Sequence, residues 1–302
     1  MYSIAQETLI RAMYFAPRGK HRLQLLGFHL SQRYLNPNDR LIGFVGDSGA
    51  GKSLLVRGMF PGLELTNDDE GVNVRPLPVV AQHERGRYQA HTFHVDARFE
   101  LAFQQGWQLA EAIRDAVMKG RRVVVEHFDQ LCNLINMTPD VLVGVGEEVI
   151  VTRPGFFGPT PTEIANIVFK SLAYRKMAHS AEELTSKVLV DMGYERPRFH
   201  SDVRHGFMLE FTDKPDLDLE EVENQVKALI AKNLEICYHD EDHIRIGNRS
   251  VFPCSGPRIH VRRTGDIQGF RLIKEFKWDP VNKLYFLAGF VGDKPEEGGL
   301  RV

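Results

Sequence analysis

Cysteine is scarce in this sequence of 302 residues, and the three cysteines present, Cys132, Cys237 and Cys254, stand far apart. An odd number of widely spaced cysteines excludes a disulfide framework, and it favours a reducing, cytoplasmic setting. No apolar run approaches the roughly 20 residues that a membrane-spanning helix needs, so we expect no membrane partner. The N-terminus also lacks the basic and then apolar pattern of a signal peptide.

A strong charge of either sign is missing too. The formal net charge is −2, so the chain as a whole does not attract nucleic acid, and any such binding needs a local basic patch. Internal repeats and low-complexity segments are absent. The 43% of hydrophobic and 26% of charged residues are typical of a globular protein, and the length predicts two domains.

One motif carries the strongest functional signal. Residues 46 to 53 read Gly46-Asp47-Ser48-Gly49-Ala50-Gly51-Lys52-Ser53, which fits the phosphate-loop pattern G-x-x-x-x-G-K-[ST] at every position. The apolar run Leu41–Val45 before it predicts a buried strand, and residues 53–59 after it predict a helix. The backbone of such a loop and the N-terminus of its helix bind phosphate groups. The alternative is a chance glycine-rich turn.

The lysine and the hydroxyl residue of this loop have different expected roles. Lys52 would contact the β- and γ-phosphates of a nucleoside triphosphate, and Ser53 would ligate Mg²⁺. The sequence contains no Asn-Lys-x-Asp motif for reading guanine, so we expect ATP by default, with Mg²⁺ as its cofactor. Basic residues before and within a predicted helix over 20–35 would either meet phosphates or form a solvated face: Arg18, Lys20, His21, Arg22 and Arg33.

An acidic run follows the predicted helix. Leu63–Thr66 predicts a short strand, and Asp68 and Asp69 come soon after it. At the carboxyl end of a strand, such residues can hold Mg²⁺ or accept a proton from an attacking hydroxyl, whereas the alternative is an acidic turn. The order of glycine-rich loop, helix, short strand and Asp-Asp over residues 41–75 resembles the kinase core of HPr kinase and its relatives. The resemblance implies that one acid of the pair acts in phosphoryl transfer.

Two further predicted strands end in polar residues. Residues 91–96 alternate polar and apolar, which places His94 and Asp96 on one side, as catalytic groups or as the polar face of an edge strand. Three valines at 123–125 precede Glu126, a pattern typical of the strand whose carboxylate contacts Mg²⁺ or orients water. Glu126 is the first candidate for that role and Asp129 the second. The alternative is a buried strand with an incidental glutamate.

A run rich in proline and glycine at residues 154–161 marks the expected domain boundary. We therefore predict an α/β protein. Residues 1–158 would form a phosphate-loop domain with a mostly parallel sheet, and residues 159–302 a second, α+β domain. In the second domain we expect a helix over 162–192, interrupted near residues 178–180 or continuous.

The second half of the sequence combines four features in a fixed order. It has His179 on the predicted helix, a predicted strand at 206–212, an acidic helix beginning near Asp218, and a segment running from Cys254 to Ile267 that includes Thr264-Gly265-Asp266. Over about residues 170–290 this resembles the second additional domain of alanyl-tRNA synthetases, a module also used by free-standing alanyl-tRNA editing proteins. The resemblance implies Zn²⁺ held by histidine and cysteine, and hydrolysis of mischarged alanyl-tRNA.

The sequence departs from that family at two ligand positions. Glu183 stands where a second helical histidine is expected, and the spacing from Cys254 to His260 is two residues too long, with Arg258 at the expected position. Glu183 and His179 are four apart and share a helix face, and carboxylates also ligate zinc. The candidate Zn²⁺ site is therefore His179, Glu183, Cys254 and His260. The alternative is a domain that keeps the fold for recognition only.

Three functions follow from these patterns. The leading hypothesis is an ATP-dependent phosphotransferase (a kinase) or NTPase that uses Lys52, Asp68, Asp69 and Glu126, and whose second domain recognises an aminoacyl-tRNA or an amino-acid-like substrate. The cations of the second half could hold a tRNA acceptor end through its phosphates. The alternatives are a Zn²⁺-dependent trans-editing hydrolase regulated by nucleotide, and a non-catalytic nucleotide-switched binding module.

Overall fold

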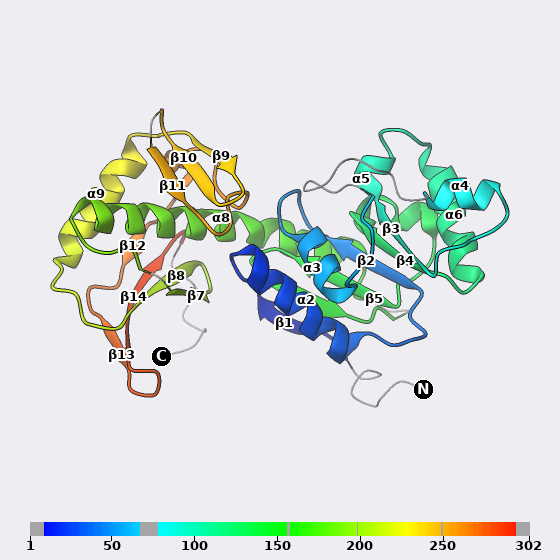
Figure 1. Ribbon diagram of the computed structural model, residues 1–302, viewed down its shortest axis with the longest axis horizontal. Helices are drawn as coiled ribbons and strands as arrows, with labels where there is room; N and C mark the ends of the chain where they lie inside the picture. The colour runs from blue at the N-terminus through cyan, green and yellow to red at the C-terminus, as the bar shows by residue number, and fades with distance from the viewer. Residues whose placement is uncertain (1–8, 67–77, 156–157, 198, 249, 294–302) are drawn as a thin grey trace. The chain divides into compact units, whose positions relative to one another are not determined.

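The computed structural model describes residues 9–66, 78–155, 158–197, 199–248 and 250–293 (Figure 1). The chain forms two compact units. Unit 1 comprises residues 1–16 and 20–170, and unit 2 comprises residues 17–19 and 171–302. The fold is α/β, with one sheet of mixed parallel and antiparallel strands and separate antiparallel sheets. In the described ranges, no helix has the length and apolar character needed to cross a membrane.

Unit 1 is built on a six-stranded sheet with the strand order β1-β6-β5-β2-β4-β3. Strands β3, β4, β2 and β5 pair in parallel, whereas β6 and β1 run antiparallel at one edge. The strands are β1 (Ala12–Phe15), β2 (Leu41–Val45), β3 (Thr92–Asp96), β4 (Arg122–Glu126), β5 (Val141–Val145) and β6 (Glu148–Thr152). Every residue of β2 is buried, as its continuous apolar run predicts for a strand covered on both faces.

Helices cover both faces of this sheet. On one face, a core of alternate strand residues packs against α4, α6, α7 and the first turns of α8; on the other, α2 packs closely on α3 (Figure 1). The two backbones meet at glycines, since a Cβ on Gly58 would lie 2.0 Å from the Gln24 carbonyl oxygen. The helices are α2 (Lys20–Tyr34), α3 (Lys52–Met59), α4 (Val79–Glu84), α5 (Ala97–Glu100), α6 (Gly106–Met118), α7 (Cys132–Ile135) and α8 (Pro161–Asp191), with a 3-10 turn η1 (Phe128–Gln130).

Unit 2 places the second part of α8 and helix α9 against antiparallel sheets. One sheet has the order β12-β14-β8-β7, with β13 beside β14, and a three-stranded sheet has the order β11-β10-β9. The core contains alternate residues of these elements together with Cys254. The elements are β7 (Phe199–Val203), β8 (Gly206–Phe211), α9 (Leu219–Ala231), β9 (Ile236–Asp240), β10 (His243–Ile246), β11 (Ser250–Pro253), η2 (Thr264–Asp266), β12 (Arg271–Leu272), β13 (Lys277–Asp279) and β14 (Leu284–Phe290).

The structure corrects one predicted element and settles another. Leu63–Thr66 does not form a strand. The Thr66 amide instead donates to the His94 side chain, and the Thr66 hydroxyl accepts from the Asp96 amide, so side-chain bonds replace a strand ladder. Helix α8 runs without a break through residues 178–180. The division between the two units falls after Lys170, inside the range of α8, whereas the sequence placed a boundary after residue 158.

Candidate functional site

The phosphate loop connects β2 to α3 and depends on its glycines. Gly46, Gly49 and Gly51 adopt positive φ angles of 155°, 77° and 95°, which side chains with a Cβ rarely tolerate. Space is short as well: a Cβ on Gly46 would lie 2.6 Å from the Val145 carbonyl oxygen, and one on Gly51 would lie 2.2 Å from Leu23 Cδ2. The local conformation therefore requires glycine at both ends of the G-x-x-x-x-G pattern.

Helix α3 begins at Lys52, directly after the loop, and no side chain caps its N-terminus. The first N–H groups of a helix have no partner within the helix and carry partial positive charge, so this end suits an anion. The Lys52 side chain is 4% exposed, and its Nζ donates to the Asp47 carbonyl oxygen of the same loop at 2.9 Å. Burial lowers the pKa of Lys52, while the charges of Glu126 and Asp96 oppose that shift.

Ser53 and Glu126 meet where β2 and β4 end. The two strands pair in parallel with Phe44 beside Glu126, so the end of β4 lies next to the loop that follows β2. Ser53 Oγ donates to Glu126 Oε2 at 3.1 Å. A hydroxyl and a buried carboxylate side by side are the two oxygen donors that hold Mg²⁺ beside a bound triphosphate. The donor set therefore fits a magnesium ion.

His94, on the neighbouring strand β3, holds the Glu126 carboxylate from the other side. Its Nδ1 accepts from the Thr66 amide at 3.0 Å, so the proton of a neutral ring sits on Nε2, which donates to Glu126 Oε1 at 3.1 Å. Burial alone would raise the pKa of Glu126, but the hydrogen bond from His94, the charge of Lys52 and the hydrogen bond from Ser53 lower it. Glu126 is thus an ionised carboxylate with one oxygen fixed by His94 and the other facing Ser53.

Three more polar residues lie at or just beyond the carboxyl ends of β3 and β4. Asp96 caps α5 by accepting from the Phe99 amide at 3.1 Å. His127 follows Glu126 with a left-handed φ of 55°, and burial and the charge of Lys52 lower its pKa to about 4. Asp129 Oδ1 is buried and has no hydrogen-bond partner among the described residues, and burial raises the pKa of this carboxyl. Sequence reasoning did not single out His127, although its position directly after a strand-terminal acid was a usable signal.

Asp68 and Asp69, the other predicted catalytic residues of unit 1, lie outside the described residues. The carboxylate that the structure brings to Ser53 is Glu126.

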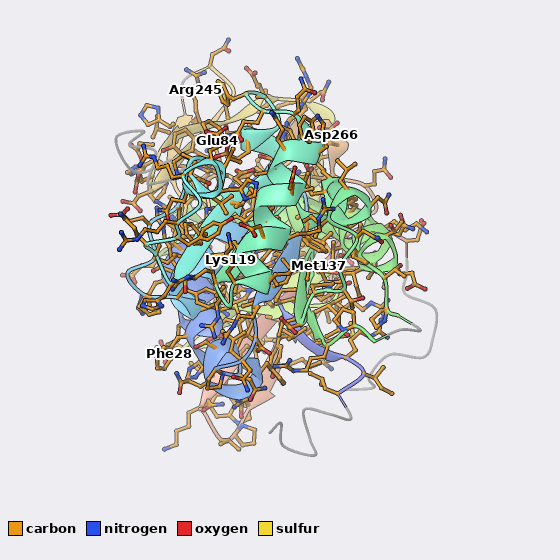
Figure 2. All side chains as sticks on the ribbon, turned by 90° about the vertical axis from the view of Figure 1, so that its right-hand side faces the viewer. Phe28, Glu84, Lys119, Met137, Arg245 and Asp266 are labelled. Carbon is orange, nitrogen blue, oxygen red and sulfur yellow. The ribbon has the colours of Figure 1, made fainter. Side chains whose placement is uncertain are left out.

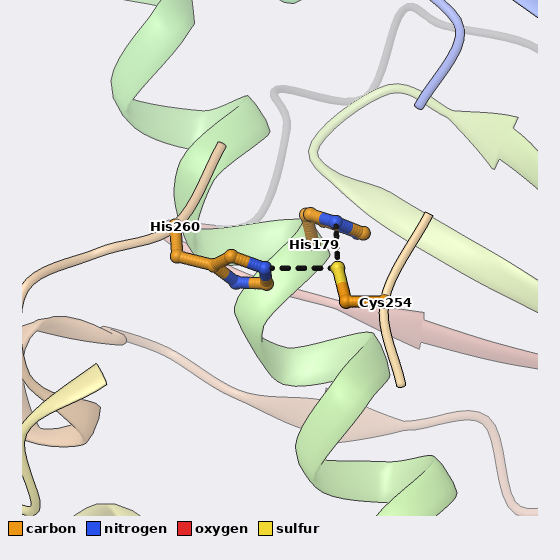
Figure 3. A group of neighbouring side chains, drawn as sticks. All are labelled: His179, Cys254 and His260. Carbon is orange, nitrogen blue, oxygen red and sulfur yellow. Dashed lines mark hydrogen bonds between the residues drawn. The ribbon is translucent and has the colours of Figure 1, made fainter. Parts of the chain in front are cut away.

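A second cluster lies in unit 2, where three potential metal ligands converge. His179 comes from α8, Cys254 from the loop after β11 and His260 from the segment before η2, and the ligand atoms all lie within 4.8 Å of one another. Cys254 Sγ is 3.3 Å from His179 Nε2 and 3.2 Å from His260 Nε2 (Figure 3). Zinc bonds of about 2.3 Å to sulfur and 2.0 Å to nitrogen in a tetrahedral arrangement separate sulfur and nitrogen by about 3.5 Å. The two sulfur–nitrogen distances therefore suit a zinc ion, and the three side chains could hold one.

Both histidines are oriented by a second hydrogen bond, as metal-ligating histidines usually are. His179 Nδ1 lies 3.2 Å from Glu182 Oε2, and His260 Nδ1 lies 3.2 Å from Ser180 Oγ. Burial alone would raise the pKa of Glu182, but the charge of Arg18 and the His179 bond lower it to about 2. Because Glu182 is ionised, His179 Nδ1 carries the proton, and its Nε2 offers a lone pair toward Cys254.

Arg18 reaches this cluster from a short segment, Pro17–Gly19, that belongs to unit 2. Its side chain forms ion pairs with Glu182 at 3.2 Å and Asp202 at 2.9 Å and is buried with them. His200 Nδ1 also lies 3.1 Å from Glu182. Arg18 is therefore neither the solvated nor the phosphate-binding residue that its place before a basic helix suggested, because it compensates a buried carboxylate.

Glu183 is not one of the three converging donors, although it lies beside the Cys254 thiol. Its Oε2 accepts from Arg196 at 2.8 Å, and burial raises the pKa of Glu183 to about 8 despite that charge. Burial, followed by the nearby Glu183, also raises the pKa of the Cys254 thiol. The two extra residues between Cys254 and His260 do not keep these side chains apart. Arg258, at the position expected for histidine, lies over the Tyr238 ring, 4.8 Å from its centre.

No protein-family model matches the chain, and no curated protein sequence matches it.

Proposed function

We propose that the chain is a Mg²⁺-dependent enzyme that binds ATP at residues 46–53 and transfers or hydrolyses its γ-phosphoryl group. The observation that carries the proposal is the 3.1 Å contact between Ser53 Oγ and Glu126 Oε2, beside the buried Lys52. A chance glycine-rich turn gives no reason for a hydroxyl, an ionised carboxylate and a lysine to meet at one edge of a sheet. Binding of a Mg²⁺–triphosphate complex uses all three, the lysine on the phosphates and the two oxygen donors on the metal.

Different residues of the site would bind the phosphates and the metal ion. The loop backbone and the N-terminus of α3 would bind the phosphates, and Lys52 would leave the Asp47 carbonyl oxygen to contact the β- and γ-oxygens. Ser53 and Glu126 would hold Mg²⁺, which supplies positive charge to the phosphate oxygens. His94 keeps Glu126 ionised and aimed. His127 and Asp129, which follow β4, would be the candidates to contact the water or hydroxyl acceptor.

Turnover of ATP by the purified full-length chain tests this proposal. Wild-type protein should release ADP in the presence of Mg²⁺ and not of EDTA, with GTP as the comparison nucleotide. Lys52→Ala and Glu126→Gln should each lower turnover by about a hundredfold or more, because each removes a charge that acts on the phosphates or the metal. Lys232→Ala and Glu111→Gln remove the same charges from exposed positions and should leave turnover unchanged. Unaltered turnover in Lys52→Ala would refute the assignment.

A second candidate function belongs to unit 2, and we propose it on a separate observation. Among the described residues, the group of converging ligand atoms contains three donors, His179, Cys254 and His260. Three protein ligands are typical of catalytic zinc sites, which keep a coordination position for water or substrate, whereas structural sites use four. Zn²⁺ there would supply a Lewis acid for the carbonyl of an aminoacyl ester, which is the chemistry of an aminoacyl-tRNA hydrolase.

Metal analysis and an ester-hydrolysis assay test this second function. We expect one zinc per chain and release of alanine from mischarged alanyl-tRNA by wild-type protein. Both should be lost in Cys254→Ala. Zinc without hydrolysis would show a structural site, and the second candidate function would be wrong while the first stood.

A further inference from the structure

A cavity of about 580 Å³ in unit 1 lies at the opposite end of the parallel strands from the phosphate loop. Its lining comes from the connection before β3 and the connection before β4, where these parallel strands begin. The residues that line it are Gly86, Arg87, Tyr88, Gln89, His91, Lys119 and Arg121. Lys119, labelled in Figure 2, lies at the end of α6. The cavity is therefore separate from the nucleotide site and uses none of its residues.

The lining is cationic, with three permanent positive charges and no carboxylate. The acid next to it, Asp115, is shared by several donors: Lys119 at 2.8 Å, the Tyr88 hydroxyl at 2.8 Å and His83 at 3.0 Å. Within the described ranges of the chain, neither Arg87 nor Arg121 has an ion pair with a carboxylate. The cavity therefore holds uncompensated positive charge.

Arg121 is fixed in place by neutral groups. One terminal nitrogen, Nη1, donates to His91 Nδ1 at 3.2 Å, and the other, Nη2, donates to the Tyr88 carbonyl oxygen at 3.1 Å. Because His91 Nδ1 accepts this bond, the proton of its neutral ring is on Nε2, which adds another donor. In the part of the chain that the structure describes, the buried Arg121 Nε has no hydrogen-bond partner. A guanidinium that is oriented in advance but not neutralised is suited to bind an anion.

We propose that this cavity binds a small phosphorylated molecule, with Arg121 contacting the phosphate and Arg87, Lys119 and His91 supplying further charge and donors. Phosphate matches the planar fork of donors on arginine. Cavities of about 300–1,000 Å³ are typical of small-molecule sites, so the space accommodates more than a bare ion. The cavity is a second anion site of unit 1, at the amino ends of the strands.

Calorimetric titration of the full chain tests the proposal, with inorganic phosphate and pyrophosphate as probes. The Lys52→Ala background removes anion binding at the phosphate loop. In that background we expect one pyrophosphate per chain, and Arg121→Gln should weaken binding about tenfold or more, the usual effect of losing a charge-assisted bond. Arg85→Gln removes a charge from an exposed position just before the cavity-lining residues and should have no effect.

Two further measurements keep the outcome decisive. Arg87→Gln changes an exposed side chain of the cavity and leaves the bonds of Arg121 intact, so it should weaken binding even if Arg121→Gln fails to fold. Titration with a short single-stranded RNA separates the two sources of phosphate. Absence of binding in the Lys52→Ala background, equal effects of Arg85→Gln and Arg121→Gln, or binding of the RNA but not of pyrophosphate would each overturn the proposal.

Discussion

Replacement of Cys254 by serine should abolish zinc binding in unit 2. The sulfur is the one atom in contact with both histidine Nε2 atoms, at 3.3 and 3.2 Å, so it is the centre of the donor group. Serine keeps the shape of the side chain but replaces a thiolate by a hydroxyl, which is not a zinc ligand at neutral pH.

The size of the effect can be bounded from the contacts. Loss of a partner that only orients a ligand costs about 10–100-fold in metal affinity, and Ser180, which contacts His260 Nδ1, is such a partner. Ser180→Ala should therefore raise the zinc dissociation constant by about tenfold. Loss of the ligand itself should exceed the upper limit, so Cys254→Ser should raise the constant more than about a hundredfold, or about 2.7 kcal/mol.

The assay is competition for zinc between metal-free protein and a chromophoric chelator, at one pH for all variants. Cys237→Ser is the matched cysteine control, because Cys237 lies on β9 and is not in the donor group. Glu183→Gln is the decisive comparison. Since Glu183 lies beside the Cys254 thiol but is not one of the converging donors, its replacement should change the zinc dissociation constant far less than Cys254→Ser does. A loss as large as that of Cys254→Ser would refute the three-ligand reading and restore Glu183 as a ligand.

Three other predictions concern the described contacts. His94→Ala should raise the Mg²⁺ concentration for half-maximal ATP turnover about tenfold, because Glu126 loses the donor that orients it; a turnover assay across Mg²⁺ concentrations checks this. Gly51→Ala should abolish nucleotide binding in a fluorescent-nucleotide titration, because the added Cβ has no space and the φ of 95° costs about 1–3 kcal/mol. Glu223→Gln should lower the free energy of unfolding at pH 7 by about 1 kcal/mol. Burial would raise the pKa of Glu223, but the Leu272 amide and two lysines lower it to about 2. The stabilising contribution of the ionised carboxylate is therefore complete above about pH 4.5 and is lost as the pH falls toward 2. Near pH 2, urea unfolding should give the same free energy of unfolding for the wild type and for Glu223→Gln.

The sequence predicts the local structure of the candidate nucleotide site well. The strand Leu41–Val45, the loop glycines and the strand ending in Glu126 are confirmed because each is encoded within a few consecutive residues. The contact between Ser53 and Glu126, and the one between His94 and Glu126, depend on which strands are neighbours. The strand order depends on pairing between residues that are far apart in the chain, so no short motif predicts it.

At the candidate metal site, the sequence alone does not identify which acid contacts His179. Helix periodicity pointed to Glu183 as the partner of His179 at four residues, whereas the structure uses Glu182 at three residues to hold the other ring nitrogen. Both spacings place a side chain near His179 on an α-helix, so the sequence alone does not choose between them. The contribution of Arg18 could not be predicted either, since it is 164 residues before Glu182 in the chain and its neighbours Ala16 and Lys20 belong to unit 1.

The three-residue segment Pro17–Gly19 makes unit 2 discontinuous along the chain. The ribosome completes Arg18 long before it makes Glu182, so the buried ion pair forms only after about three fifths of the protein has been synthesised. A fragment that begins after residue 170 would contain all three converging metal donors and still leave Glu182 without its main counter-charge. Unpairing a buried charge costs about 3–5 kcal/mol, so such a fragment should fold poorly unless Pro17–Gly19 is restored to it. Division of the chain at any single point therefore cannot reproduce the two units.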